Sequence, residues 1–456
     1  MATYLNAPSG RFGTPTNAKK YTISTWLKLA VASTENNFFS YNYGSYQSIS
    51  IEIRNDDTLR INQYVPGTDT YDIRTNRVFR DPSAWYHIVI KYDSTQSTAS
   101  DRVKIYINGE NQTSLAASSY PGQNVDSFIA ATPNNNKGIN IGGLWDSSGN
   151  PTAGQYFLGY MAQFIYTDGY AYDASTFGST NTNGIWIPNT GPSVTYGTNG
   201  FKLDFAGTGT TANASGFGAD TSGNGNHFTA NSLGTNPSAS DTCQNNFATW
   251  NPLVNRSFQY PMTLSEGNLK VIADSNTSYG STMAATVSLG KGKWFWEFKY
   301  TTSGTGGYVV GWGEDTYNFN YQADAYPYKS TLGSSSGVFY RADGGKAVNG
   351  TETGSAGDAW AQNDIIGVAA DFDASTITFY NQGVSQFTVT SAFTSTVNYY
   401  PEFYGYGSKG GQANFGNPPY TIASGNADAN GYGNFEYAVP SGYYALCTKN
   451  LALYGG

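Results

Sequence analysis

The chain has 456 residues, of which 24 are basic and 32 are acidic, so its net charge is −8. Charged residues make up 12% of the sequence and aromatic residues 16%, with 54 glycines. So little charge disfavours coiled coils, helix bundles and disordered tails, which depend on charge to stay solvated. The lack of any Lys/Arg cluster argues against a nucleic-acid partner, and no apolar run reaches the ~18–20 residues of a membrane span. The composition predicts an all-β protein.

Strand patterns dominate the first third of the chain. Apolar and polar residues alternate over residues 21–29, and again over residues 49–53 and 59–61, which a turn joins into a hairpin. The same alternation returns over residues 86–92 and 103–107. Short strands separated by Gly, Asn, Asp and Ser turns predict a β-sandwich or jelly roll.

The composition of the sequence changes twice further along the chain. Residues 187–257 are rich in Gly, Ser, Thr and Asn, and we expect a connecting segment with one strand near Phe201 to Phe205. Alternation returns at 258 and is strongest over residues 294–300. The predicted division is residues 1–186 and 258–421 as two sandwiches, 187–257 as the connection, and 422–456 as a C-terminal segment with a strand at 443–446.

Five segments of the first domain occur in an order that resembles a known family. They are YTISTWLKL, WYHIVIKYD, VKIYINGE, INIGG and YFLGYMAQFIYTDG, spread over about residues 10–180. This set resembles a laminin G-type, concanavalin A-like jelly roll. The resemblance implies a sandwich of two antiparallel sheets.

The second sandwich resembles a SPRY domain, itself a concanavalin-like fold. The matching segments are GKWFWEFKY, VVGWGED, NDIIGVAADFDASTITFYNQG, YYPEFYGYG and ANFGNPP. One departure is Asn381-Gln382-Gly383, where the family has Asn-Gly, and it leaves the geometry of that turn open. The expected fold class is therefore all-β, with two concanavalin A-like jelly-roll sandwiches joined by a Gly/Ser/Asn-rich segment.

Three further stretches resemble bacteriophage fibre and virion-surface proteins. They are ADTSGNGNHFTANSL, DTCQNNFATWNPL and VPSGYYALCTKNL. The N-terminus shows no secretory signal pattern. The resemblance implies a protein of the phage particle surface, made in the host cytoplasm, with other virion proteins and a host-surface glycan as partners. Weak glycan sites need avidity, so we expect a homo-oligomer, most simply a trimer.

No pattern in the sequence assembles a catalytic site. Gly-x-Ser-x-Gly is absent, and neither His87 nor His227 stands in a triad context. The paired carboxylates of glycosidases on this fold project from one strand face, whereas the adjacent Glu314 and Asp315 point to opposite faces. Glu297, alone among aromatics, is predicted to be solvated outward or structurally paired, and His87 to be structural or at the surface. The chain is predicted not to be an enzyme.

Metal and redox chemistry are only weakly suggested. Cys243 and Cys447 are 204 positions apart, so two unpaired thiols are favoured over a disulfide, which stays open. The laminin G-type resemblance implies a Ca²⁺ site, and three loops offer oxygen ligands, although the same loops are ordinary turns. No other cofactor is expected. The candidate Ca²⁺ loops are Asp56-Asp57, residues 146–150 and residues 220–226.

Carbohydrate binding is better supported by residue type, because aromatic rings stack on sugar faces while polar groups take the hydroxyls. The SPRY resemblance places one tyrosine-rich loop where that family contacts ligands. The structural alternative is that tyrosines brace sheets by cross-strand pairing. The candidate contacts are Tyr41, Tyr43 and Tyr46 in one loop, Tyr317, Tyr321, Asp324 and Tyr326 in the other, and Trp145.

The leading hypothesis is a virion structural protein (tail fibre, tail tip or capsid-attached fibre) that recognises host glycan without chemistry. One alternative is a structural decoration that clamps neighbouring virion proteins. The other is a tailspike-type glycan depolymerase, whose two carboxylates, roughly 5–10 Å apart, would come from different strands.

Overall fold

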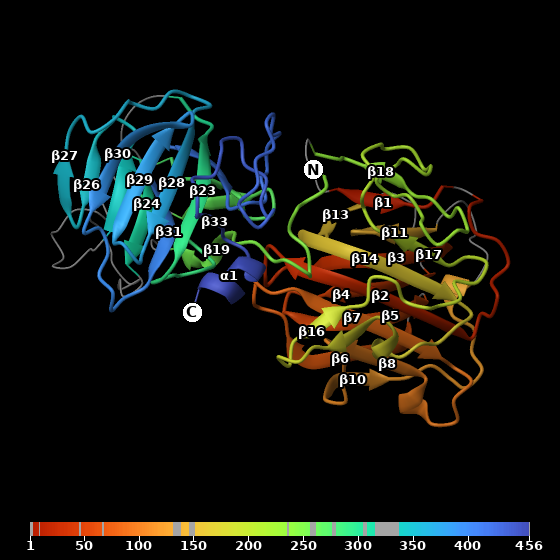
Figure 1. The fold of residues 1–456 in the computed structure, drawn as a ribbon. Helices are drawn as coiled ribbons and strands as arrows, with labels where there is room; N and C mark the ends of the chain where they lie inside the picture. The colour runs from red at the N-terminus through yellow and green to blue at the C-terminus, as the bar shows by residue number, and fades with distance from the viewer. Residues whose placement is uncertain are drawn as a thin grey trace. The chain divides into compact units, whose positions relative to one another are not determined.

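The fold is described from a computed structural model of the chain (Figure 1). The described residues are 3–8, 10–44, 47–65, 68–130, 138–145, 151–234, 237–255, 261–275, 280–303, 308–314 and 337–455. The chain divides into two compact units, Met1–Ser238 and Ala239–Gly456.

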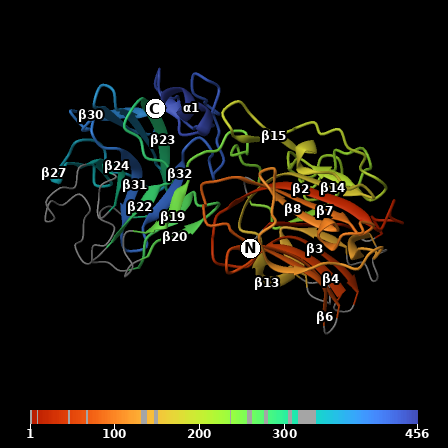
Figure 2. The ribbon, with the colours of Figure 1, turned by 90° about the horizontal axis from the view of Figure 1, so that it is seen from below.

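The first unit is a sandwich of two antiparallel sheets (Figure 1). The eight-stranded sheet has the order β10 (Leu115–Ser119), β6 (Thr68–Val78), β5 (Thr58–Val65), β4 (Gln47–Ile53), β3 (Asn36–Gly44), β11 (Ile139–Ile141), β1 (Tyr4–Asn6) and β18 (Thr229–Asn231). The six-stranded sheet has the order β17 (Phe201–Leu203), β14 (Gly159–Asp168), β2 (Lys20–Leu29), β7 (Tyr86–Asp93), β8 (Val103–Ile107) and β9 (Glu110–Asn111). Figure 2 shows β3, β4 and β6 as neighbouring parts of one layer.

Short elements complete this unit. They are the hairpins β12 (Gly143–Trp145) with β13 (Pro151–Tyr156) and β15 (Gly178–Thr180) with β16 (Trp186–Pro188), and the 3-10 turns η1 (Ala99–Asp101), η2 (Phe128–Ala130) and η3 (Ala174–Thr176). The hairpin β15–β16 closes because the Trp186 ring packs directly on Gly109 and Gly178, where a Cβ atom would lie within 2.6 Å of the ring.

Alternation of side chains explains the core of the first unit. In β2, Tyr21, Ile23 and Leu27 face inward, and in β7, Ile90 and Tyr92 do the same. The Tyr21 and Tyr92 rings stack at 4.9 Å between centroids. The hairpin expected from residues 49–61 is confirmed as β4 and β5.

The structure divides the chain differently from the predicted boundaries. Residues up to 238 belong to the first unit, because β17 extends its six-stranded sheet and β18 pairs with β1. Phe201 and Phe228 are fully buried and meet at 4.7 Å between ring centroids. Sparse aromatic residues within a Gly- and Asn-rich stretch were thus enough to anchor it in the core.

The second unit is also a two-sheet sandwich. One sheet has the order β19 (Trp250–Asn255), β22 (Ser281–Ala285), β31 (Tyr399–Gly405), β24 (Val309–Glu314), β25 (Gly337–Arg341), β26 (Lys346–Val348) and β27 (Thr351–Thr353). The other has the order β20 (Thr263–Ser265), β21 (Lys270–Ile272), β32 (Gly410–Asn414), β23 (Lys293–Tyr300), β28 (Ile365–Asp371), β29 (Thr376–Asn381) and β30 (Val384–Thr390), with β33 (Tyr444–Ala445) parallel to β23.

Aromatic side chains fill the core of the second unit. Trp250, Trp294, Trp296 and Trp312 are fully buried, and the rings of Trp250 and Trp296 meet edge to face at 6.0 Å. All-β architecture with two jelly-roll-type sandwiches is therefore confirmed. Within the described residues the single α-helix is α1 (Thr448–Tyr454), and no described helix is long and apolar enough to cross a membrane.

The turn at Asn381-Gln382-Gly383 keeps hairpin geometry despite its departure from the family pattern. Asn381 pairs with Val384, so Gln382 and Gly383 form a two-residue loop between β29 and β30. Both residues have positive φ, 51° and 77°, as a type I′ turn requires. Gln382 therefore occupies a left-handed position that non-glycine residues adopt at some cost.

Candidate ligand-binding surface

The outer face of the eight-stranded sheet carries a continuous row of small polar side chains. Because Ile51 and Ile61 point into the core, their neighbours Ser50 and Asn62 point outward. Strand register places Ser50 opposite Asn62, and Asn62 opposite Asp72. The full row, one residue from each strand and here named the polar row, is Thr229, Asn6, Asn140, Ser40, Ser50, Asn62, Asp72 and Ser119.

A second, charged row runs beside it. Asn37, Glu52, Arg60 and Arg74 are register partners on β3, β4, β5 and β6. The Arg60 guanidinium forms a two-pronged ion pair with Asp72, with N–O distances of 2.8 and 3.1 Å. Its third nitrogen lies 3.8 Å from the Glu52 carboxylate. Arg60 therefore stands between two carboxyl groups that come from different strands.

Glu52 lies in an unusual electrostatic setting. Burial, and then the neighbouring Glu35 carboxylate, raise the pKa of Glu52 to about 7. The positive charge of Arg60 opposes this shift. A carboxyl group with such a pKa exchanges its proton near neutral pH, as a general acid does.

Asn37 adds an unsatisfied amide to this face. Its side chain is fully buried, and within the described residues neither its nitrogen nor its oxygen has a hydrogen-bond partner. Buried amides are normally satisfied, so this position can gain hydrogen bonds.

Accessibility rises along the rows from β3 to β6. The exposed fraction of the side chain is 10% at Glu52, 20% at Arg60 and 24% at Asp72. At the β3 end, the hairpin β12–β13 rests on the face, because Ser40 donates a hydrogen bond to the carbonyl of Gly143 and Asn42 to that of Trp145. The surface is therefore closed on one side and open over β5 and β6.

Trp145 stands on that hairpin in an aromatic group. Its ring meets Tyr4 edge to face at 5.4 Å, and Tyr4 stacks on Tyr156 at 6.0 Å. All three side chains are half-buried. The indole N–H of Trp145 has no hydrogen-bond partner within the described residues. Trp145 therefore lies at the closed, β3 side of the rows, with its ring half-buried and its indole nitrogen buried.

The other residues predicted to contact a ligand are either buried or lie outside the described residues. Tyr41 is buried in the core of the first unit, because β3 turns odd-numbered residues inward there, so its prediction as a ligand contact was wrong. The side chains of Tyr43 and Tyr46 lie outside what the structure describes. The same holds for Tyr317, Tyr321, Asp324 and Tyr326. Of the eight predicted residues, Trp145 is the one that the described structure brings to a candidate surface.

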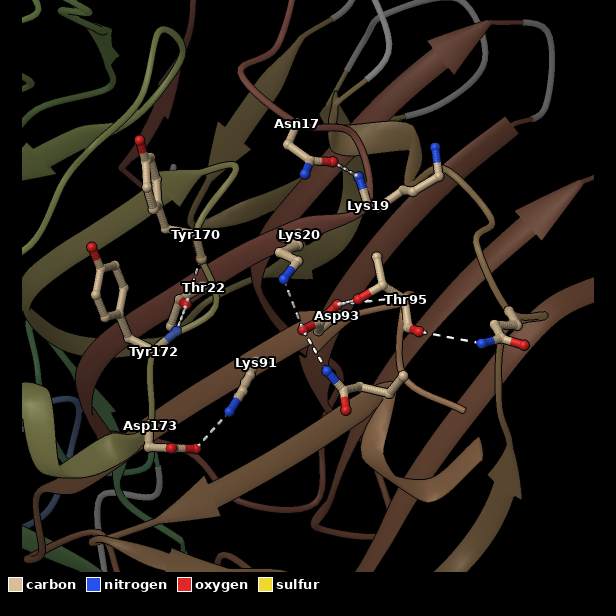
Figure 3. A network of polar contacts seen from close by, with 12 residues as sticks. Asn17, Lys19, Lys20, Thr22, Lys91, Asp93, Thr95, Tyr170, Tyr172 and Asp173 are labelled. Atoms are coloured by element: carbon tan, nitrogen blue, oxygen red, sulfur yellow. Dashed lines mark hydrogen bonds and ion pairs between the residues drawn. The ribbon is translucent and has the colours of Figure 1, made fainter. Parts of the chain in front are cut away.

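The outer face of the six-stranded sheet is polar too, but its groups are paired with each other (Figure 3). Lys20 lies 3.3 Å from Asp93, and Lys91 lies 2.9 Å from Asp173. Tyr170 and Tyr172 extend side by side from this face and stack at 6.2 Å, as Figure 3 shows. This face offers fewer unsatisfied groups than the eight-stranded sheet.

His87 is a structural residue on that face. Its ring stacks on Trp26 at 4.7 Å, and the Trp186 indole N–H donates a hydrogen bond to its Nδ1. The proton of the neutral ring therefore sits on Nε2, which lies 2.9 Å from the Ser24 hydroxyl. Burial lowers the pKa of His87 to about 3, so the ring stays neutral and is inaccessible to a substrate.

The described carboxylates of the candidate Ca²⁺ loops are used within the protein. Asp57 accepts hydrogen bonds from the Ser33 backbone and the Arg80 guanidinium. Asp220 accepts three backbone N–H groups, including those of Ser222 and Asn226. Residues 146–150 lie outside the described part of the chain, and the described residues contain no group of three His, Cys, Asp or Glu side chains that could hold a metal.

Glu297 has a structural role in the second unit. It is fully buried and accepts hydrogen bonds from the Asn414 amide and from the backbone N–H groups of Glu436 and Tyr437. Burial raises its pKa to about 7, against the effect of these donors. Of the two predicted roles, structural pairing is confirmed.

Both Cys243 and Cys447 are unpaired, in agreement with the favoured expectation.

Comparison with known families agrees with this architecture. Residues 2–169 match the family described as the concanavalin A-like lectin/glucanases superfamily, and residues 293–418 match the SPRY domain. The chain joins a concanavalin A-like, laminin G-type domain to a SPRY domain. The polar and charged rows belong to the first of these domains, and Glu297 belongs to the second.

Solved structures match parts of the chain at low identity. The SPRY domain of human HERC1 is 19% identical, and the match covers 36% of this chain and 94% of that chain with a TM-score of 0.29. A Bacteroides ovatus structure described as a carbohydrate binding protein is 18% identical, with 51% of this chain and 56% of that chain covered and a TM-score of 0.34. The chain matches no curated protein sequence.

Sequence reasoning missed the polar and charged rows. Ser50, Glu52, Asn62 and Asp72 were visible as the polar positions of alternating strands. Their convergence depends on the register of β3 to β6, which the alternation itself does not fix. The hairpin β4–β5 was predicted, and its register would have placed Glu52 opposite Arg60.

Proposed function

We propose that this protein recognises a glycan without catalysis, through the outer face of the eight-stranded sheet. The observation that carries the proposal is the open end of the polar and charged rows over β5 and β6, in a domain that matches a lectin and glucanase superfamily. The Arg60 and Asp72 side chains at this open end stand on neighbouring strands roughly 4.8 Å apart, and charged and polar groups of this kind bind sugar hydroxyls.

The SPRY domain is proposed to hold other proteins, and the virion surface of a phage is the proposed location. Support for the location is the resemblance of residues 219–233, 241–253 and 439–451 to phage fibre proteins. In this arrangement one domain contacts the host glycan and the other contacts neighbouring virion proteins.

The test is to incubate the purified full chain with intact host cells and with their extracted surface polysaccharide. Bound protein and newly released reducing ends are measured together. We expect saturable binding without released ends. Asp72→Asn, at the open end of the rows where 24% of the side chain is exposed, should weaken binding, whereas Tyr170→Ala on the other sheet should leave it unchanged. If the two variants bind equally well, the glycan site lies elsewhere on the protein. Tyr321→Ala and Tyr326→Ala then test the second predicted loop.

A second candidate function is supported by Glu52 and Asp72. Their carboxyl groups come from different strands to one face, where Arg60 bridges them, and the pKa of Glu52 is raised to about 7. Glycan hydrolysis uses such a carboxyl pair, one protonated and one ionised. Reducing ends released by the wild type and abolished in Glu52→Gln would establish a depolymerase in place of the non-catalytic proposal. Absence of binding to cells and polysaccharide would leave the structural decoration.

A further inference from the structure

The strands at the edges of the sheets are protected unequally. An edge strand exposes unpaired N–H and C=O groups, which proteins shield by short length, proline, charge or bulges. Five of the eight edge strands have only two or three residues: β9, β17, β18, β20 and β27. The edge strand β19 contains Pro252 and a register shift, and β10 is a shifted strand of Leu, Ala and Ser.

The eighth edge strand, β30, lacks most of these devices (Figure 1). Its sequence VSQFTVT has seven residues, no charge and no proline. Val, Thr and Phe, which favour strands, make up five of the seven positions. The side chain of Val384 at its start is exposed, with 64% of the residue surface accessible. β30 therefore presents a strand-forming sequence at an edge that has few of these protective devices.

Over the second half of β30, the outward backbone groups have no partner among the described residues. Residues 387–390 pair regularly with β29, and a register shift at Gln386 interrupts the ladder before them. The Asp358 backbone donates a hydrogen bond to the Gln386 side chain, so a neighbouring loop shields the strand at the shift. Within the described residues, no group outside β29 hydrogen-bonds to the backbone of residues 387–390. An antiparallel strand with one neighbour leaves alternate N–H and C=O groups pointing outward.

We propose that β30 pairs antiparallel with β30 of a second copy of this chain. The strand carries no charge, so two copies meet without the like-charge repulsion that facing charges would cause. Each copy offers the same donors and acceptors, and antiparallel pairing of identical strands about a two-fold axis satisfies both sets. The contact is isologous and closes as a dimer, which replaces the trimer expected from avidity alone. This inference concerns the SPRY unit and is independent of the glycan proposal.

The oligomeric state in solution tests this inference. We expect light scattering after gel filtration to give twice the chain mass for the full-length protein, falling toward the single-chain mass on dilution. Thr388→Lys combined with Thr390→Lys places positive charges on exposed positions of β30, and the mass should halve at the same concentration. Thr351→Lys on the three-residue edge strand β27 is the matched control and should remain dimeric. Thermal melting checks that each variant is folded.

A charge-complementation experiment sharpens the result. Thr388→Lys and Thr388→Glu variants should each be monomeric alone and should form a dimer when mixed in equal amounts. Failure of the mixture to dimerise would overturn the direct β30–β30 contact. The inference would also be overturned by a wild type that stays monomeric up to high concentration, or by a lysine variant with the wild-type mass.

Discussion

The two units treat the outer faces of their sheets in opposite ways. In the first unit, the outer face of the eight-stranded sheet is polar and opens toward β6, with 24% of the Asp72 side chain exposed. In the second unit, the chain's own C-terminal segment covers part of the outer face of β23 and β28. Phe295 and Ala369 lie there beneath Phe435. One sandwich thus leaves part of an outer face accessible, and the other uses an outer face for internal packing.

The covering segment was not expected to belong to the SPRY sandwich. The predicted boundary at 421 separated residues 422–456 from it, yet β33 pairs with β23 and Glu297 binds the backbone at Glu436 and Tyr437. A second buried carboxylate, Asp428, accepts hydrogen bonds from the Ala445 backbone and the Asn450 amide. Two buried carboxylates therefore fix a segment that has little regular secondary structure.

Removing the ring that anchors this segment should have the largest effect. Phe435 is fully buried and packs on Phe295 at 5.2 Å, so Phe435→Ala should destabilise the second unit by about 3–5 kcal/mol. Hydrogen exchange resolved by segment should show faster exchange across β23 and β28 and unchanged exchange in β2 and β7. Leu453→Ala, at a position that is 66% exposed, is the control and should change stability by less than about 0.5 kcal/mol. Equal destabilisation by both variants would mean that the segment is not held by Phe435.

The pH dependence of stability gives a second, smaller contrast. Glu52 in the first unit and Glu297 in the second both have a pKa of about 7, raised from the usual value near 4.5. The folded state therefore holds each proton more tightly than the unfolded state does. The resulting stability is complete below about pH 4.5 and is lost as the pH rises through about 7, by roughly 3 kcal/mol for each carboxyl.

Urea unfolding followed by hydrogen exchange between pH 5 and pH 8 measures this contrast. Glu52→Gln should flatten the pH profile of the first unit alone, and Glu297→Gln that of the second alone. If the stability of a unit still falls with pH in the variant that lacks its glutamate, another group causes the pH dependence. Stability that rises with pH in this range would contradict the raised pKa values directly.

Trp145 should show the smallest effect on stability and a separate effect on binding. The side chain is half-buried on the short hairpin β12–β13, so Trp145→Ala should cost the first unit about 1 kcal/mol. Affinity for the polysaccharide should fall about tenfold if the ring stacks on a sugar. An aromatic ring contact of this kind contributes about 1.4 kcal/mol, which corresponds to a tenfold change in affinity. Trp145→Phe should recover part of the affinity. Unchanged affinity in both variants would remove Trp145 from the glycan surface.

Sequence reasoning recovered the fold better than the site. The alternation in residues 21–29 and 294–300 predicted β2 and β23, because each strand buries one face and its pattern is local. The short helix α1 was missed, since residues 448–454 show no apolar stripe long enough to stand out. Glu52 was missed as well, because its raised pKa arises from burial and from Glu35, which come together only in the folded chain.

The bond between Glu297 and the backbone at residue 437 spans 140 positions of the chain. A ribosome that has just completed β23 must still add those residues before the buried carboxylate meets its donors. The first unit can close once β18 has emerged and paired with β1, whereas the second stays open until residues 436–445 have been added. During that interval Phe295 and its apolar neighbours remain uncovered, so of the two units the SPRY half exposes its apolar surface for longer during synthesis.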